Sequence, residues 1–234
     1  DVEMALLATH RALETSQGLD EPELLTLCLQ QACEQHIMIG RYRPVEQYLA
    51  QVKGQSGLLD RLDNRPALAM ANRTIGEINN RLGRFDKAVH WLLAAMKIYR
   101  ALEDQLAIGQ TLNLLGECSR LRGQSGAAVP FYRKALAIVN GLDNQIEITK
   151  VRTNLAAALV DLGSYDAAER ALRLVVQMVE DFGKMAGWYD INRIYVDQAL
   201  AQVGKGQHDL ALRAANRAHR KAAMEESESA MGLA

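Results

Sequence analysis

Apolar residues follow one another along this chain with the three- and four-residue spacing of amphipathic helices, and the pattern restarts about every 40 residues. The clearest copy, residues 71–105, predicts two helices joined by a tight turn at Gly83. Similar patterns surround four other glycines, which are Gly40, Gly123, Gly163 and Gly206. The spacing therefore predicts consecutive helical hairpins with no strands.

Small residues recur at fixed distances from each turn glycine. A small residue precedes the glycine by seven positions, and small residues follow it by five and by twelve. Such residues let two helices approach closely, so we expect them at the helix crossings inside each hairpin. In the second to fourth copies they are Gly76, Ala88 and Ala95; Gly116, Ala128 and Ala135; and Ala156, Ala168 and Val175.

The sequence also indicates where helices begin and where they are interrupted. Asp63-Asn64, Asp104 and Asp143-Asn144 precede predicted helices, where their side chains can cap free N–H groups. Gly54-Gln55-Ser56-Gly57 falls inside a second helix, and two glycines there cost about 1 kcal/mol each, so we expect a break or kink. Pro130 should bend another second helix locally.

The repeating unit resembles the tetratricopeptide repeat, in which Leu-Gly is followed by a turn glycine and then by spaced alanines. Ile75-Gly76, Gly83 to Ala88 and Ala95 carry this resemblance most fully. The long spacing is similar to that of kinesin light chains and of the sensor arms of bacterial signal-transduction ATPases. The resemblance implies an all-α, right-handed α-solenoid of about five hairpins preceded by one extra helix.

The expected organisation follows from the copies. Residues 1–20 are predicted to form a leading helix, the second half of a repeat whose first half was cut away, and residues 227–234 a tail. Between them, residues 21–226 divide into five repeats, at 21–63, 64–103, 104–143, 144–183 and 184–226.

Composition narrows the function classes. The formal net charge is −1, which gives no electrostatic reason to expect nucleic acid or an anionic membrane as partner. No apolar run is long enough to span a bilayer. Three cysteines without disulfide-like spacing suit a reducing cytoplasm, and the five histidines lack metal-ligand spacing. We therefore predict no catalytic residues, metal or cofactor, and hence no enzyme.

The resemblance also implies where a partner binds, because the first helix of each tetratricopeptide hairpin lines the concave side. Long polar side chains at those positions are candidates to hold a peptide, and amides such as Asn113 can both donate to and accept from its backbone. The candidate set comprises Gln30, Glu34, Arg73, Glu77, Arg81, Asn113, Glu117, Arg120, Lys150, Asn154 and Arg193.

These observations predict a protein–protein interaction scaffold, the repeat module of a larger cytoplasmic regulatory protein that binds a peptide or partner helix. The alternative is a ligand- or peptide-sensing arm of a signal-transduction ATPase or transcription regulator, which allows a small-molecule effector. The oligomeric state stays open.

Overall fold

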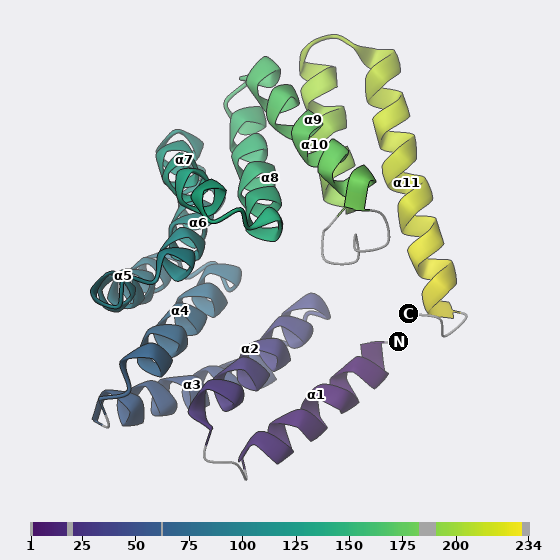
Figure 1. Cartoon of the computed structure of the whole chain (residues 1–234). Helices are drawn as coiled ribbons and strands as arrows, with labels where there is room; N and C mark the ends of the chain where they lie inside the picture. Colours follow the sequence, from purple (N-terminus) through teal and green to yellow (C-terminus); the bar gives the residue numbers. More distant parts are fainter. Residues whose placement is uncertain (1, 18–20, 62, 183–190, 231–234) are drawn as a thin grey trace. The chain divides into compact units, whose positions relative to one another are not determined.

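The computed structural model describes residues 2–17, 21–61, 63–182 and 191–230, and these residues are helices and short turns without strands. Figure 1 follows the helices from the purple to the yellow end of the chain. The helix bounds are α1 Val2–Gln17, α2 Pro22–Met38, α3 Tyr42–Arg61, α4 Arg65–Arg81, α5 Phe85–Ala101, α6 Gln105–Leu121, α7 Ser125–Gly141, α8 Gln145–Asp161, α9 Tyr165–Phe182, α10 Ile191–Gly204 and α11 His208–Ala230.

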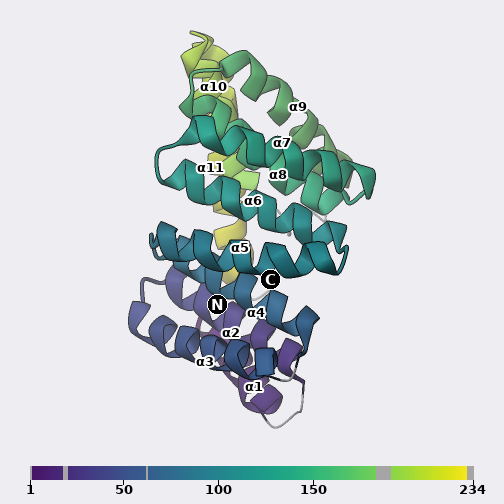
Figure 2. The same cartoon turned by 90° about the vertical axis from the view of Figure 1, so that its left-hand side faces the viewer.

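The helices form two compact units, Asp1–Cys118 and Ser119–Ala234. Within the first unit, α2 packs on α3 and α4 packs on α5, with α1 against α2. Figures 1 and 2 both place α3 and α5 on one side of this unit, with α2 and α4 on the other. Within the second unit, α8 packs on α9 and α10 on α11. The expected all-α hairpin repeat is confirmed.

Glycine ends the first helix of every pair. Gly40, Gly83, Gly123, Gly163 and Gly206 have φ values of 70°, 70°, 80°, 68° and 72°, in the left-handed region that a side chain disfavours. At Gly83 the chain closes the turn with two backbone bonds, from Gly83 N to Asn80 O at 3.0 Å and from Arg84 N to Asn79 O at 2.8 Å. The expected positions of the hairpin turns are confirmed.

The small residues lie at the helix crossings, as the spacing predicts. Ala88, Ala95, Ala128, Ala135 and Ala168 are fully buried. A Cβ added to Gly76 would lie 2.7 Å from Leu92 Cγ and 3.2 Å from Ala88 O, so α4 and α5 meet where only glycine fits.

Larger side chains fill the space between hairpins. In the first unit one core runs from Leu29 through Val52 and Leu59 to Ile75, and Trp91 packs against it. In the second unit Ala156, Leu172, Val175 and Ile194 form a smaller cluster. Each hairpin therefore buries its apolar surface on its neighbour, as repeat architectures require.

Of the break or kink expected in α3, the break is wrong. The helix continues without a break from Tyr42 to Arg61, through both glycines of the Gly54-Gln55-Ser56-Gly57 segment. Buried Val52 before the segment and Leu59 after it anchor the two halves of the helix on the same core. Packing therefore outweighs the unfavourable propensity of the glycines.

Some expected features lie outside the described residues. These are the end of the leading segment at residues 18–20, the linker at 183–187 between the last two repeats, and the final residues 231–234. Helix α11 ends at Ala230, so residues 227–230 of the expected tail are helical.

Candidate functional site

Polar side chains join the first helices of neighbouring hairpins in the first unit. Gln30 on α2 donates through Nε2 to Glu77 Oε2 on α4 at 3.3 Å, and its Oε1 accepts from Thr74 Oγ1 at 3.0 Å. Glu77 also pairs with Arg81, one turn along α4, at 3.6 Å. The three predicted residues Gln30, Glu77 and Arg81 therefore belong to one connected network.

Arg73 extends the connection from α4 to α6. Its Nη1 donates to Gln110 Oε1 at 3.2 Å, although its Nε is buried without a described partner. Burial raises the pKa of the Tyr99 phenol, while the neighbouring Arg73 acts in the opposite direction. On α6, Asn113 and Glu117 are half-buried. Arg73 is thus held between a buried tyrosine and the next first helix.

The second unit repeats this arrangement between α8 and α10. Arg193 donates from Nη2 to Asn154 Oδ1 at 3.3 Å, and its Nε lies 3.8 Å from Asp197 Oδ2. Lys150, on the same helix as Asn154, pairs with Glu147 at 3.1 Å and is half exposed. The predicted residues Asn154 and Arg193 are therefore in direct contact.

Arg120 occupies a different setting near the end of α6. It lies 3.6 Å from Asp161, which also accepts a hydrogen bond from Ser125 at 2.9 Å. This cluster connects the α6–α7 turn to the end of α8. The side chain of Glu34 on α2 is outside the described ones.

Six of the candidate residues thus form polar links between successive first helices; they are Gln30, Glu77, Arg73, Arg120, Asn154 and Arg193. What they offer chemically is recognition: carboxylates, guanidinium groups and amides that can exchange hydrogen bonds with a peptide. Among the described residues, no group of three or more His, Cys, Asp or Glu is placed to hold a metal ion. No described helix is long and apolar enough to cross a bilayer.

Sequence reasoning missed a cavity of about 630 Å³ in the first unit, on the side of the second helices. It is lined from α3, α4 and α5, and Trp91 is half-buried on its wall. The signal available in the sequence was Gly57 inside α3, which lines the cavity without a side chain.

Comparison with known proteins agrees with the geometry. Residues 67–140 match a model described as tetratricopeptide repeat, and residues 150–181 match a second model with the same description. Regulatory protein AfsR of Streptomyces griseus is 30% identical over 101 residues, which is 43% of this chain. The matched segment is 10% of AfsR, so the chain corresponds to a small part of that protein.

Solved structures share the fold at low identity. BtubC (BKLC) from P. vanneervenii superposes with a TM-score of 0.74 at 18% identity, over 96% of this chain and 92% of its own. A Rap protein in complex with competence and sporulation factor gives 0.72 at 16% identity, over 99% of this chain and 63% of its own.

A third structure belongs to the signal-transduction ATPases, whose sensor arms the repeat spacing resembles. This STAND protein from Pyrococcus horikoshii, with a tetratricopeptide repeat sensor, gives a TM-score of 0.57 at 13% identity, over 99% of this chain and 42% of its own. The two matched segments show that the chain contains tetratricopeptide repeats, and the turn glycines and small-residue crossings lie where those repeats need them.

Proposed function

We propose that this chain is a protein-interaction module that binds an extended peptide or a partner helix on the polar face of its first helices. In the first unit that face is formed by α2, α4 and α6, and it includes Gln30, Glu77, Arg73 and Asn113. We call these four residues, together with Arg81 and Glu117, the first-helix face.

The observation that carries the proposal is the set of links between helices. Gln30 reaches Glu77 and Arg73 reaches Gln110, so side chains from three consecutive first helices are already held in place. A surface whose side chains are ordered before binding loses less conformational entropy when a peptide arrives. The connected network therefore supports recognition on this face.

The charge pattern favours a partner with both signs of charge. The first-helix face carries Arg73 and Arg81 beside Glu77 and Glu117, together with the amide of Asn113. Such mixed groups fix the register of a peptide more than they add raw affinity. We expect a polar peptide of low net charge, with its backbone contacting the amides.

The other parts of the proposal follow from the same surface. We propose a non-catalytic role without a cofactor, in the cytoplasm, as one module of a larger regulatory protein. Support comes from the repeat-family matches and from the likeness to one segment of the regulatory protein AfsR.

A peptide selection tests the proposal even while the natural partner is unidentified. A random peptide library is displayed and selected on the whole chain, and the selected peptides are titrated by calorimetry. Asn113→Ala and Arg81→Ala should each weaken binding by about tenfold, the equivalent of 1.4 kcal/mol, through loss of a direct contact.

Arg100→Ala is the matched control, because Arg100 is also an arginine in the last turn of a helix, α5. It should leave the peptide affinity within twofold of the wild type. Equal losses from Arg81→Ala and Arg100→Ala, or none from Asn113→Ala, would place the binding surface elsewhere.

The second candidate function is a sensor arm that reports a bound peptide or small molecule to another domain. The Rap structure contains competence and sporulation factor, and the STAND protein carries its tetratricopeptide repeats as a sensor. Under this proposal, binding must change the chain's own conformation and not only recruit a partner.

Scattering separates the two functions. The radius of gyration of the whole chain is measured by small-angle X-ray scattering with and without a selected peptide. A sensor contracts or extends on binding, whereas a recruiting scaffold keeps its dimensions. An unchanged scattering profile at saturation would rule out the sensor for that peptide.

A further inference from the structure

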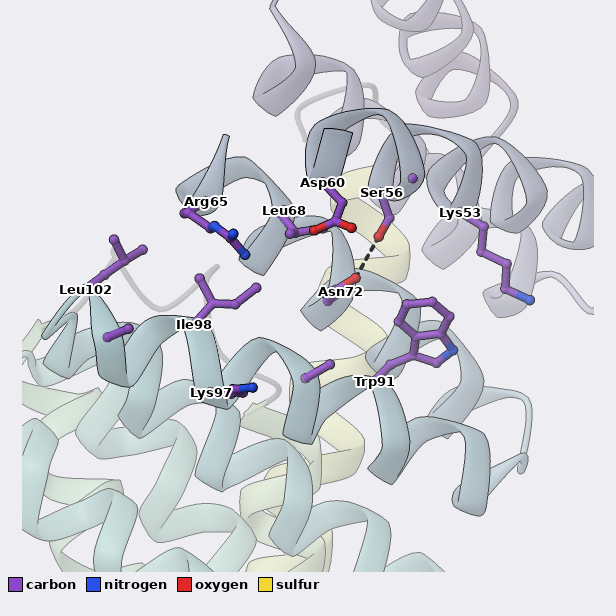
Figure 3. Close-up of a pocket in the computed structure, with 13 residues that line it drawn as sticks. Lys53, Ser56, Asp60, Arg65, Leu68, Asn72, Trp91, Lys97, Ile98 and Leu102 are labelled. Atoms are coloured by element: carbon purple, nitrogen blue, oxygen red, sulfur yellow. Dashed lines mark hydrogen bonds between the residues drawn. The ribbon is translucent and has the colours of Figure 1, made fainter. Parts of the chain in front are cut away.

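The cavity in the first unit lies between two consecutive second helices. Its walls come from α3 and α5, and Leu68 and Asn72 of α4 form its floor (Figure 3). Its volume of about 630 Å³ is within the range of small-molecule sites, which span about 300–1,000 Å³. It is therefore large enough for a ring-containing ligand.

Glycine keeps this cavity open. Gly57 of α3 lines it, and a Cβ placed on Gly57 would meet no atom within 4 Å. Beside it, buried Ser56 donates to Asn72 Oδ1 at 2.7 Å, which holds α3 against α4 at the base of the cavity (Figure 3). The Ser56–Asn72 hydrogen bond thus fixes one edge of the cavity, and Gly57 leaves the space beside it empty because glycine has no side chain.

The walls are apolar and the rim is cationic. Leu68, Trp91, Ile98 and Leu102 supply hydrocarbon and ring surface. Three cationic residues line the cavity against one acidic residue, Asp60; they are Lys53, Arg65 and Lys97. Arg65 pairs with Asp63 at 2.5 Å.

Lys53 and Lys97 are the cations available to a ligand. Neither forms an ion pair with any described residue, and both are exposed. Apolar walls beside two exposed ammonium groups that are in no ion pair match an anion that has an apolar body. A hydrocarbon ligand without charge would gain nothing from them.

We propose that this cavity is a binding site for a small organic anion with an apolar, ring-containing body. The body lies against Trp91 and Ile98, and the anionic group faces Lys53 or Lys97, which lie on opposite sides of the cavity (Figure 3). The site is separate from the first-helix face, because Leu68 and Asn72 are about 140° around α4 from Arg73 and Glu77. Ligand and peptide can therefore bind together, and the site does not depend on the proposed peptide function.

The probe for a test is 8-anilinonaphthalene-1-sulfonate, an aromatic anion whose fluorescence rises in an apolar site. Titration into the whole wild-type chain should saturate at one molecule per chain. Gly57→Phe fills the open space with a ring and should weaken binding at least tenfold while keeping the melting temperature and the circular dichroism of the wild type.

Gly54→Phe is the matched control, since Gly54 lies one turn earlier on α3, has no atom within 4 Å of a Cβ and does not line the cavity. It should bind the probe within twofold of the wild type. Equal binding by the wild type and Gly57→Phe, or equal losses in both glycine variants, overturns the proposal.

Removing the two lysine charges tests the proposal independently of whether Gly57→Phe folds. Lys53→Gln combined with Lys97→Gln should weaken the anionic probe about tenfold. Its neutral counterpart N-phenyl-1-naphthylamine should bind the wild type and the double variant alike. Equal affinity of the anionic probe for the wild type and the double variant would contradict the assigned ligand class.

Discussion

At the scale of single residues, two helices approach most closely where their side chains are smallest. Gly76 of α4 sits against Leu92 and the backbone of Ala88, and the glycines at the hairpin turns hold positive φ values. These two roles differ physically, since the first depends on space between helices and the second on backbone conformation.

Gly76→Leu should lower the free energy of unfolding by about 1–3 kcal/mol, because the new side chain has to displace Leu92. Chemical denaturation followed by circular dichroism measures the change. Gly54→Leu is the control in an open helical position, where loss of glycine should keep or raise stability. A Gly76→Leu protein as stable as the wild type would show that α4 and α5 do not cross there.

A single residue, His36, makes the stability of the fold depend on pH. It is buried beside the rings of His10 and Tyr48, with centroids 6.0 and 5.7 Å away. Burial, followed by the charges of His10 and Arg41, lowers the pKa of His36 below its usual 6.5. Between that lowered value and 6.5, the unfolded chain binds more protons than the folded one, so stability falls as the pH drops below about 6.5.

His36→Phe should remove this contribution. The variant should lose less stability than the wild type between pH 7 and pH 5, because the phenyl ring takes up no proton in either state. Neither ring nitrogen of His36 has a described hydrogen-bond partner, so the substitution sacrifices no described bond. Parallel denaturation curves at the two pH values test this, and identical pH dependence in both proteins would contradict it.

At the scale of helices, three connections between hairpins share one backbone and capping arrangement. Asp63, Glu103 and Asp143 adopt positive φ, and the next residue caps the following helix. Asn64, Asp104 and Asn144 accept hydrogen bonds from the N–H groups of Ala67, Ala107 and Glu147. Helices α4, α6 and α8 therefore each begin at a side-chain cap.

Asn144→Ala should lower the free energy of unfolding by about 1 kcal/mol through loss of the cap on α8. Asn140→Ala, four residues earlier and inside α7, removes the same side chain from an exposed helical position and should change stability little. Thermal or denaturant unfolding of the pair measures the difference. Equal effects would mean that the Asn144 side chain does not act as a cap.

The turns and caps were predictable from the sequence because each depends on a residue type suited to one backbone conformation. The continuity of α3 was not, since local propensity at Gly54 and Gly57 favours a break and only packing of Val52 and Leu59 opposes it. The cavity was missed for a related reason. It depends on the spacing of α3 and α5 as well as on Gly57, and no local pattern encodes that spacing.

At the scale of the whole molecule, repeats interact with their immediate neighbours. A destabilising substitution should therefore affect only the hairpins next to it. Gly204 of α10 packs on the ring of Tyr165 at the start of α9, and a Cβ there would overlap that ring. Lys205 strengthens the same contact through Asp166 at 2.8 Å and Glu169 at 2.5 Å. This contact joins the last two hairpins of the second unit.

Gly204→Ala should raise amide hydrogen exchange in α9, α10 and α11 while leaving α2 to α5 unchanged. Mass spectrometry of peptides from the deuterated chain resolves the two regions. Faster exchange along the whole chain would instead indicate that it unfolds as one cooperative block.

Polar residues on the first helices of both units illustrate what the repeat pattern predicts and what it leaves open. The positions of Gln30, Glu77, Asn154 and Arg193 on first helices follow from the repeat. Their contacts do not, because the partners Gln30–Glu77 and Asn154–Arg193 are 47 and 39 residues apart in sequence. Under the proposed function, the preference for one peptide over another depends on contacts of this kind.

One measurement tests the central claim most directly: two-dimensional NMR of the whole chain titrated with a selected peptide. The side-chain amide signals of Asn113 and Gln110 report on the first-helix face, and the indole N–H signal of Trp91 reports on the cavity between α3 and α5. We predict that the peptide shifts both amide signals and leaves the Trp91 signal in place. A peptide that shifts Trp91 while both amide signals stay unchanged would contradict the account.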